Sequence, residues 1–199
     1  MNHLAHCLLS GDDTSLLLGN FIADFVGIKE ADLLPSNIKQ GIELHKIIDE
    51  FTDHHPLVGE AKSLLYPTQG KYAPVTIDIL FDHFLIQSWD IYSNVPLTSF
   101  VDDIYIKFQT NFDFFSDTMK PRVTMMITHD FLHSCEDEPR LRSTFNRMVK
   151  RASFPNNFVT AYDDMMDNYE ELNSVFNSFF PELKAEAQDF IDSLTTDLP

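Results

Sequence analysis

The stretch from Ser36 to Pro56, which reads SNIKQGIELHKIIDEFTDHHP, decides the fold. Its apolar residues recur largely at the three- and four-residue spacings that are typical of one face of an α-helix, and they are Ile38, Ile42, Leu44, Ile47, Ile48 and Phe51. Pro35 and Ser36 suit the beginning of a helix, and Pro56 suits the residues that follow its end. The stretch therefore predicts a long amphipathic helix.

The same periodicity continues on both sides of this helix. It predicts further helices over 13–27, about 75–89, 97–115, 119–134, 139–151 and 158–176, and a last helix that begins after Pro181. For the first of these we expect an N-cap at Asp13 or Thr14 and a stop at Gly27. No segment alternates polar and apolar residues over the length of a strand, and there are only 6 glycines. We predict an all-α helical bundle that forms a single domain over residues 1–199.

The composition is that of a folded, acidic protein. Of the 199 residues, 44% are hydrophobic and 23% are charged, which excludes disorder as the main state. The 14 basic and 31 acidic residues give a formal net charge of −17, which disfavours nucleic acid and anionic lipid as partners. The N-terminus lacks the positive region of a signal peptide, and no apolar run approaches the ~18 residues of a membrane span. The 2 cysteines form no CxxC pair. We expect a cytoplasmic protein without membrane insertion.

The basic residues are unevenly distributed along the chain. Seven of the 14 lie between residues 120 and 151, where only four acids occur, so this window is locally positive. Its candidates for binding an acidic partner are Arg140, Arg142, Arg147, Lys150 and Arg151. The residues after 160 carry ten acids and one lysine, and internal pairing with them is the alternative role of the basic window.

Polar residues interrupt the apolar pattern of two helices. In the helix from Ser36, His45, Asp49 and Asp53 recur every four residues, which places three possible metal ligands in a row on one face. In the helix over 13–27, Asn20 and Asp24 have the same spacing. A carboxylate among apolar neighbours is costly to bury without a partner, and a cation is one such partner.

Two other segments repeat this arrangement. Asp78 and Asp82 are four residues apart and are followed by His83, and Asn2 and His6 share the spacing near the N-terminus. Imidazole nitrogens together with carboxylate oxygens suit Mn²⁺, Fe²⁺, Zn²⁺ or Mg²⁺. Helix capping or a hydrogen bond in the core also explains each pair taken alone. Their coincidence in four segments indicates a shared metal site.

The sequence shows no side-chain nucleophile of a known pattern. It contains no nucleophile elbow, glycine-rich phosphate loop or dinucleotide fingerprint, and Ser10, Ser88 and Cys7 have no base at a recognisable spacing. If the chain is a hydrolase, we expect its nucleophile to be a metal-bound water, because a metal lowers the pKa of water to near neutrality.

The segments that carry these patterns resemble the acyl carrier protein phosphodiesterase family. The matching strings are MNHLAH (1–6), GNFIADF (19–25), GIELHKIIDEFTDHHP (41–56), DILFDHFL (78–85) and FFPEL (179–183), in the order and spacing of the family. The resemblance covers nearly the whole chain. One departure is Lys46, where an arginine is common, because lysine keeps the charge but not the bidentate fork that grips a phosphate.

The resemblance implies a fold, an activity and a set of site residues. The fold would be that of an atypical relative of the helical HD phosphohydrolases, and the activity would be Mn²⁺-dependent hydrolysis of holo-acyl carrier protein to the apo-carrier and 4′-phosphopantetheine. The metal centre would contain Asp24, His45, Asp49, Asp82 and His83, with His6, Asp53 and Asp78 as outer or alternative ligands. A carboxylate such as Asp53 or Asp78 would orient the water as a general base, so the candidates for a catalytic role are Asp24, Asp53 and Asp78.

Two other functions fit the same residues. A metal phosphohydrolase of this helical class that acts on a nucleotide or another small phosphodiester would use the same ligands but would not depend on the basic window. A noncatalytic helical adaptor would use its His and Asp side chains only to satisfy one another, and it would bind no metal.

Overall fold

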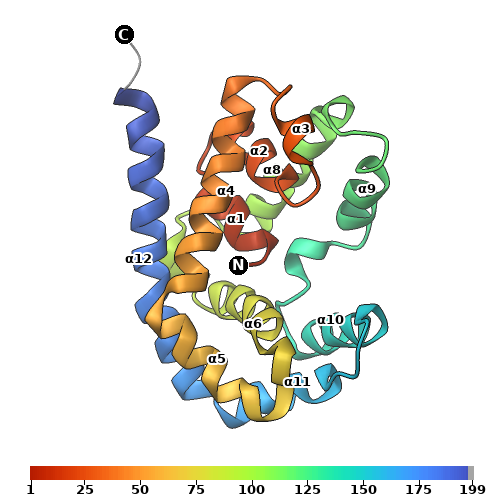
Figure 1. Cartoon of the computed structure of the whole chain (residues 1–199), viewed down its shortest axis with the longest axis vertical. Helices are drawn as coiled ribbons and strands as arrows, with labels where there is room; N and C mark the ends of the chain where they lie inside the picture. The colour runs from red at the N-terminus through yellow and green to blue at the C-terminus, as the bar shows by residue number, and fades with distance from the viewer. Residues whose placement is uncertain (197–199) are drawn as a thin grey trace.

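The computed structural model describes residues 1–196, and every regular element in this part of the chain is a helix (Figure 1). The α-helices are α1 (His3–Leu9), α2 (Thr14–Ile22), α3 (Ile28–Ala31), α4 (Ser36–His54), α5 (Pro56–Gln69), α6 (Ala73–Gln87), α7 (Trp89–Tyr92), α8 (Leu97–Thr110), α9 (Lys120–Thr128), α10 (Glu138–Arg151), α11 (Ala161–Asp167) and α12 (Tyr169–Thr196). Short 3₁₀ helices are η1 (Gly70–Tyr72), η2 (Phe112–Phe114), η3 (Phe131–His133) and η4 (Phe158–Thr160). The predicted all-α fold is confirmed. Over residues 1–196, no helix combines the length and the apolar composition needed to cross a bilayer.

The two longest helices, α4 and α12, lie side by side along the long axis, and α6 lies across the middle (Figure 1). Eleven of the 15 residues of α6 are buried, so this helix is the centre of the core. Its Phe81 and Phe84 pack against Phe176 of α12, with ring centroids 5.5 Å and 6.1 Å apart. Contacts of this kind account for the many phenylalanines in the sequence.

Several predicted helix boundaries are confirmed. α4 begins at Ser36 and ends at His54, just before Pro56. Asp13 is the N-cap of α2, because its carboxylate accepts the N–H groups of Ser15 and Leu16. The predicted stop at Gly27 is wrong, since α2 ends at Ile22 and Gly27 precedes α3. The chain turns earlier because the Ile22 carbonyl accepts both the Phe25 and the Val26 N–H.

Proline and the chain around it explain the other differences from the predicted helices. Pro56 follows the end of α4 and also opens α5, because the first helical position needs no N–H donor. The sequence pattern does not predict α5. The last helix begins at Tyr169 and runs through Pro181, so its predicted start is wrong. Its Phe176 and Phe179 are fully buried, and this packing outweighs the local cost of an interior proline. The helix predicted over 158–176 is divided between η4, α11 and α12.

The backbones of α2 and α4 approach each other closely where the two helices cross, and this crossing positions the site. A Cβ atom on Gly41 would lie 2.7 Å from Gly19 Cα and 2.8 Å from Asn20 N, and still closer to the Leu16 carbonyl. A Cβ atom on Gly19 would meet Gly41 Cα at 2.8 Å and collide with the Ile38 carbonyl. Only glycine at both positions lets the helices cross at this distance.

We expect Gly19→Ala and Gly41→Ala each to lower the free energy of unfolding by about 1–3 kcal/mol or more, because the backbone would have to shift. Gly59→Ala is the matched control: Gly59 lies in α5 and a Cβ atom there meets nothing within 4 Å. This control should raise the free energy of unfolding by ~0.5–1 kcal/mol. Urea unfolding of the three variants measures the difference, and similar values for all three would contradict the role of the crossing.

Candidate metal centre

Three side chains from two helices meet near the N-terminus of the chain. His6 of α1 and His45 of α4 stack with ring centroids 4.3 Å apart. Their Nε2 atoms lie 3.2 Å and 3.1 Å from the two carboxylate oxygens of Asp49, which is one turn after His45 on α4. The three residues offer ligand atoms that all lie within 4.8 Å of one another. This group, the His6–His45–Asp49 cluster, is the one set of this kind among the described residues.

Asn20 of α2 holds both imidazole rings in place. Its Oδ1 lies 2.8 Å from His6 Nδ1 and 3.0 Å from His45 Nδ1. Its Nδ2 donates to the His6 carbonyl and to Ser10 Oγ, which fixes the orientation of the amide. An amide oxygen only accepts, so both rings carry a proton on Nδ1, and in the neutral ring Nε2 has the free lone pair. Both Nε2 atoms therefore face Asp49.

Two further carboxylates and an amine border the cluster. Asp24 Oδ1 lies 3.3 Å from His45 Nε2. The buried Met1 amine lies 3.3 Å from Asp78 Oδ1 and 3.7 Å from Asp49 Oδ1. The Asp24 side chain is 51% exposed and that of Asp78 is 39% exposed. The cluster is thus buried on the histidine side and open to solvent on the side of these carboxylates.

The charges of these groups are strongly coupled. Burial acts to lower the pKa of His45, but hydrogen bonds to Asp24 and Asp49 outweigh burial and raise it to about 9. Burial acts to raise the pKa of Asp49, but His45 and His6 outweigh it and hold the pKa far below its usual range. Burial lowers the pKa of His6, which is therefore neutral at pH 7. Without a metal, His45 is the protonated member of the pair.

The donor set fits a divalent cation. His6 Nε2 is buried and makes no hydrogen bond, although it lies close to a carboxylate. A buried nitrogen lone pair without a donor is costly, and a metal ion between His6, His45 and Asp49 would satisfy it. Histidines whose second nitrogen donates to a fixed acceptor, as both do here to Asn20, are the usual form of metal-ligating histidine.

Comparison with known proteins identifies the family of the chain. Residues 1–183 match the family model described as acyl carrier protein phosphodiesterase. The chain belongs to this family. Curated relatives with that name include those of Photorhabdus laumondii (28% identical, over 96% of this chain and 98% of the relative), Yersinia enterocolitica (29%, over 95% and 98%) and Enterobacter sp. strain 638 (30%, over 95% and 98%). No solved structure matches the chain.

The structure brings together some of the residues that the family resemblance implies. His6, Asp24, His45, Asp49 and Asp78 gather at the cluster. His6, expected only as an outer or alternative ligand, lies at its centre.

Three of the implied residues contribute no atom to the cluster. Both Asp82 oxygens accept backbone N–H groups at the start of α1, from Leu4 and Ala5. Burial raises the pKa of Asp82 to about 7, against these two hydrogen bonds, which lower it. His83 Nδ1 instead bonds the Cys135 carbonyl, 2.7 Å away. The Asp53 side chain is 72% exposed and pairs with Lys62 of α5.

The sequence pattern includes Asn20, through its spacing to Asp24, but gives it no role in the site, and the pattern does not include the Met1 amine. For Asn20 a signal exists, because it follows Gly19 within the otherwise apolar segment Leu16 to Ile22. An amide in such a segment has to find partners inside the protein. Nothing in the pattern indicates the position of the Met1 amine.

The basic window divides into a paired part and an unpaired part. Arg140 pairs with Asp130, Glu136 and Asp137. Arg142 pairs with Glu138 and with Asp163, so internal pairing with the acidic segment after 160 is confirmed for this arginine. Arg147 donates only to the Ser143 and Thr144 hydroxyls. Lys150 and Arg151 are exposed and have no acidic partner among the described residues. The C-terminal half of α10 therefore carries the unpaired positive charge.

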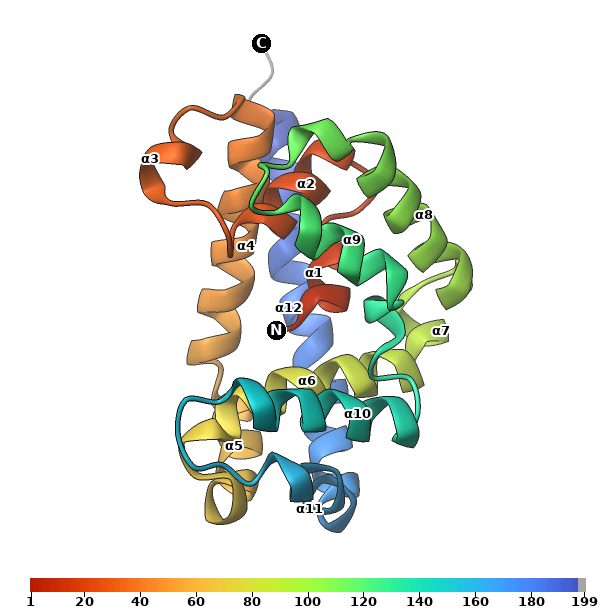
Figure 2. The same cartoon turned by 90° about the vertical axis from the view of Figure 1, so that its right-hand side faces the viewer.

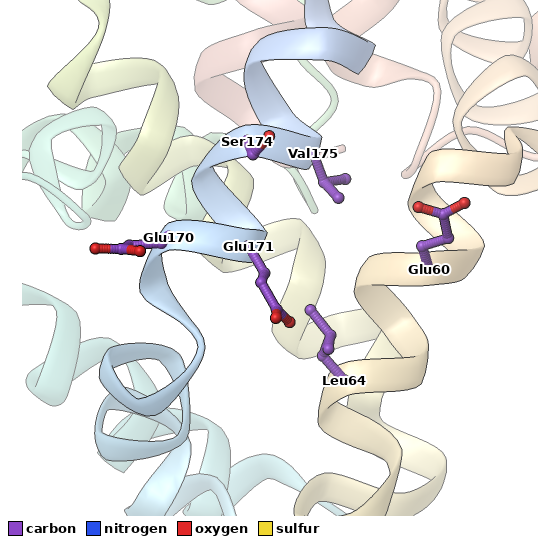
Figure 3. Close-up of a pocket in the computed structure, with 6 residues that line it drawn as sticks. All are labelled: Glu60, Leu64, Glu170, Glu171, Ser174 and Val175. Atoms are coloured by element: carbon purple, nitrogen blue, oxygen red, sulfur yellow. The ribbon is translucent and has the colours of Figure 1, made fainter.

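Two hollows of the surface are lined by none of the three cluster residues. One lies between α5 and α12 (Figure 3) and is lined by Glu60, Leu64, Glu170, Glu171, Ser174 and Val175. The other is formed by α4, the start of α5 and α12, and includes Glu50 and Glu186. Both carry acidic side chains, which makes them unsuited to a phosphate group.

In the metal-free protein, the stability that His45 contributes should depend on pH. Its pKa is raised from 6.5 to about 9, so this contribution is fully present below pH 6.5 and is lost as the pH rises through about 9. We expect the Tm measured in EDTA to fall between pH 6.5 and 9. His45→Gln should show a smaller fall of the Tm. The fall that remains in this variant would come from the Met1 amine, because the pKa of that amine is also raised. Identical profiles for the two proteins would contradict this role of His45.

Proposed function

We propose that the chain hydrolyses the phosphodiester bond of holo-acyl carrier protein, giving the apo-carrier and 4′-phosphopantetheine. The observation that carries this proposal is the His6–His45–Asp49 cluster with its fixed imidazole rings, in a chain that belongs to the phosphodiesterase family over residues 1–183. Cys7 and Cys135 are free and buried, which suits the reducing cytoplasm in which we place the reaction.

The metal centre is part of the same proposal. His6, His45 and Asp49 would hold the ion, and Asp24 is the nearest additional carboxylate. Mn²⁺ is our first choice, and Mg²⁺, Fe²⁺ and Zn²⁺ fit the same nitrogen and oxygen donors. When bound, the ion supplies a water of lowered pKa and offsets negative charge on the phosphoryl oxygens.

The remaining chemistry falls to the side chains at the open side of the cluster. In the reaction, the P–O bond to the carrier serine breaks, the hydroxyl of a water adds to phosphorus, and a proton ends on the serine oxygen. We assign Asp78 to accept the proton from water, because its carboxylate is partly exposed and lies beside the cluster. Asp53, the other candidate, is engaged by Lys62 and has no contact with the cluster.

The unpaired part of α10 is our candidate for the carrier docking surface. Figure 2 shows the N-terminus, which marks the cluster, facing the viewer between α4 and α9, with α10 running below it on the same side. Acyl carrier proteins are acidic, so their approach to a chain of net charge −17 needs a local positive surface. Arg147, Lys150 and Arg151 supply it, together with the exposed apolar side chains of Val149 and Phe154. Arg140 and Arg142, also candidates from the sequence, are already paired with acids.

Incubation of holo-acyl carrier protein with this protein and Mn²⁺, followed by intact-mass spectrometry, tests the activity. We expect the carrier to lose the mass of 4′-phosphopantetheine, and EDTA to prevent the loss. His6→Ala and Asp49→Ala should abolish both Mn²⁺ retention and hydrolysis, whereas Asp53→Asn should retain both. An unchanged carrier mass with folded, metal-loaded protein would favour a small phosphodiester substrate, and wild-type protein that binds no metal would favour an adaptor.

The docking surface makes a separate kinetic prediction. In Arg147→Glu/Arg151→Glu, we expect KM for holo-acyl carrier protein to rise about tenfold or more, with kcat within about twofold, because charge mainly affects encounter. Lys29→Glu/Lys39→Glu has the same change in net charge but lies at α3 and the start of α4. This control should keep the wild-type KM. Equal KM values for the two double variants would exclude the unpaired part of α10 as the docking surface.

A further inference from the structure

Three carboxylates, from Asp24, Asp49 and Asp78, lie at the cluster, and the Met1 amine together with a divalent ion would balance their charge without exceeding it. A phosphodiester that reaches the cluster therefore meets no net positive charge. Lys46, which occupies the family position where arginine is common, does not supply another cation, because it is exposed and pairs with Glu43 at 3.1 Å. A different basic side chain is therefore needed to bind the phosphate oxygens.

Arg122, in the first turn of α9, contacts the segment that carries Asp24. Its guanidinium carbon is 5.1 Å from the ring centroid of Phe25, the residue that follows Asp24. The Phe25 ring also neighbours Phe21 of α2, at 5.7 Å, and His3 of α1, stacked at 6.5 Å and 24°. The Arg122–Phe25–His3 stack connects α9 to the helix that carries His6, and His3 interacts electrostatically with Asp24 and His6.

The guanidinium of Arg122 is held in place but not neutralised. Arg122 is exposed, and within residues 1–196 its side chain makes no hydrogen bond and no ion pair. The contact with the Phe25 ring uses the face of the guanidinium and leaves its N–H groups free for a planar, bidentate contact with two oxygens. Arg140 and Arg142 contrast with it, since acids occupy their N–H groups.

We propose that Arg122 is an anion-binding residue of the site and that its guanidinium binds the non-bridging oxygens of the phosphodiester in front of the cluster. The inference deepens the proposed function and rests on its phosphodiester substrate, but not on the identity of the group esterified to the phosphate. Phe25 is the positioning residue, because it orients the guanidinium without touching the phosphate.

The test measures binding of inorganic phosphate to the Mn²⁺-loaded protein by ³¹P relaxation, in wild type, Arg122→Ala and Arg122→Lys. The matched control is Lys120→Ala, on the same turn of α9, because Lys120 already pairs with Asp117. We expect Arg122→Ala to weaken phosphate binding on the order of ten- to a hundredfold, as for the loss of a charged hydrogen-bond pair. Arg122→Lys should be intermediate, and Lys120→Ala should match wild type, all with unchanged Mn²⁺ affinity.

Hydrolysis of bis(p-nitrophenyl) phosphate by the same variants separates this inference from the proposed function. A loss of kcat/KM in Arg122→Ala supports the anion site even if holo-acyl carrier protein is not cleaved. Phosphate affinity and kcat/KM within about twofold of wild type, in a folded Arg122→Ala protein that retains Mn²⁺, would overturn the assignment.

Discussion

The crossing of α2 over α4 is the constraint on which the candidate site depends. At Gly19 and Gly41 the two backbones are in van der Waals contact, and no side chain separates them. Asn20 follows directly after the contact on α2, and His45 lies one turn beyond Gly41 on α4. The close approach brings the short amide of Asn20 within 3.0 Å of the His45 ring. With wider spacing of the helices, an asparagine would not reach, and the ring would lose the acceptor that fixes its orientation.

Asn20 is where the structural and chemical requirements of the site meet. Its amide uses both N–H groups and both acceptor positions inside the protein, so it adds no unsatisfied polar group to the core. In doing so it directs two Nε2 atoms toward Asp49 and holds α1 against α2. Asp82 holds the N-terminal end of α1, because its carboxylate accepts the N–H groups of Leu4 and Ala5. It thereby helps to fix the position of His6. Two buried polar residues, Asn20 and Asp82, thus position the side chains of the cluster without being members of it.

Unpaired arginines give an acidic protein a locally positive surface at the C-terminal half of α10. The acids bordering the cluster suit a cation, and they also repel a phosphate that arrives without one. In Figure 2, α9, the helix that carries Arg122, lies above the N-terminus, and α10 lies below it. Arg140 and Arg142 are as basic as Arg147 and Arg151, but their ion pairs use their charge to hold α10 in place. The packing of the helices, and not the composition, therefore decides which arginines are left without an acidic partner among the described residues.

The sequence by itself determined the all-helical class, the limits of α4 and the N-cap of α2, because helical periodicity and capping are local properties of the chain. Four-residue spacing places His45 and Asp49 together whatever the rest of the fold. Tertiary structure decided the remainder. Three features depend on which helices pack together. Pro181 lies inside a helix, His6 belongs to the cluster, and Asp82 accepts hydrogen bonds from the backbone of α1. Such long-range contacts leave no periodic trace in the sequence, so residues 78 positions apart, such as Leu4 and Asp82, meet only in the folded chain.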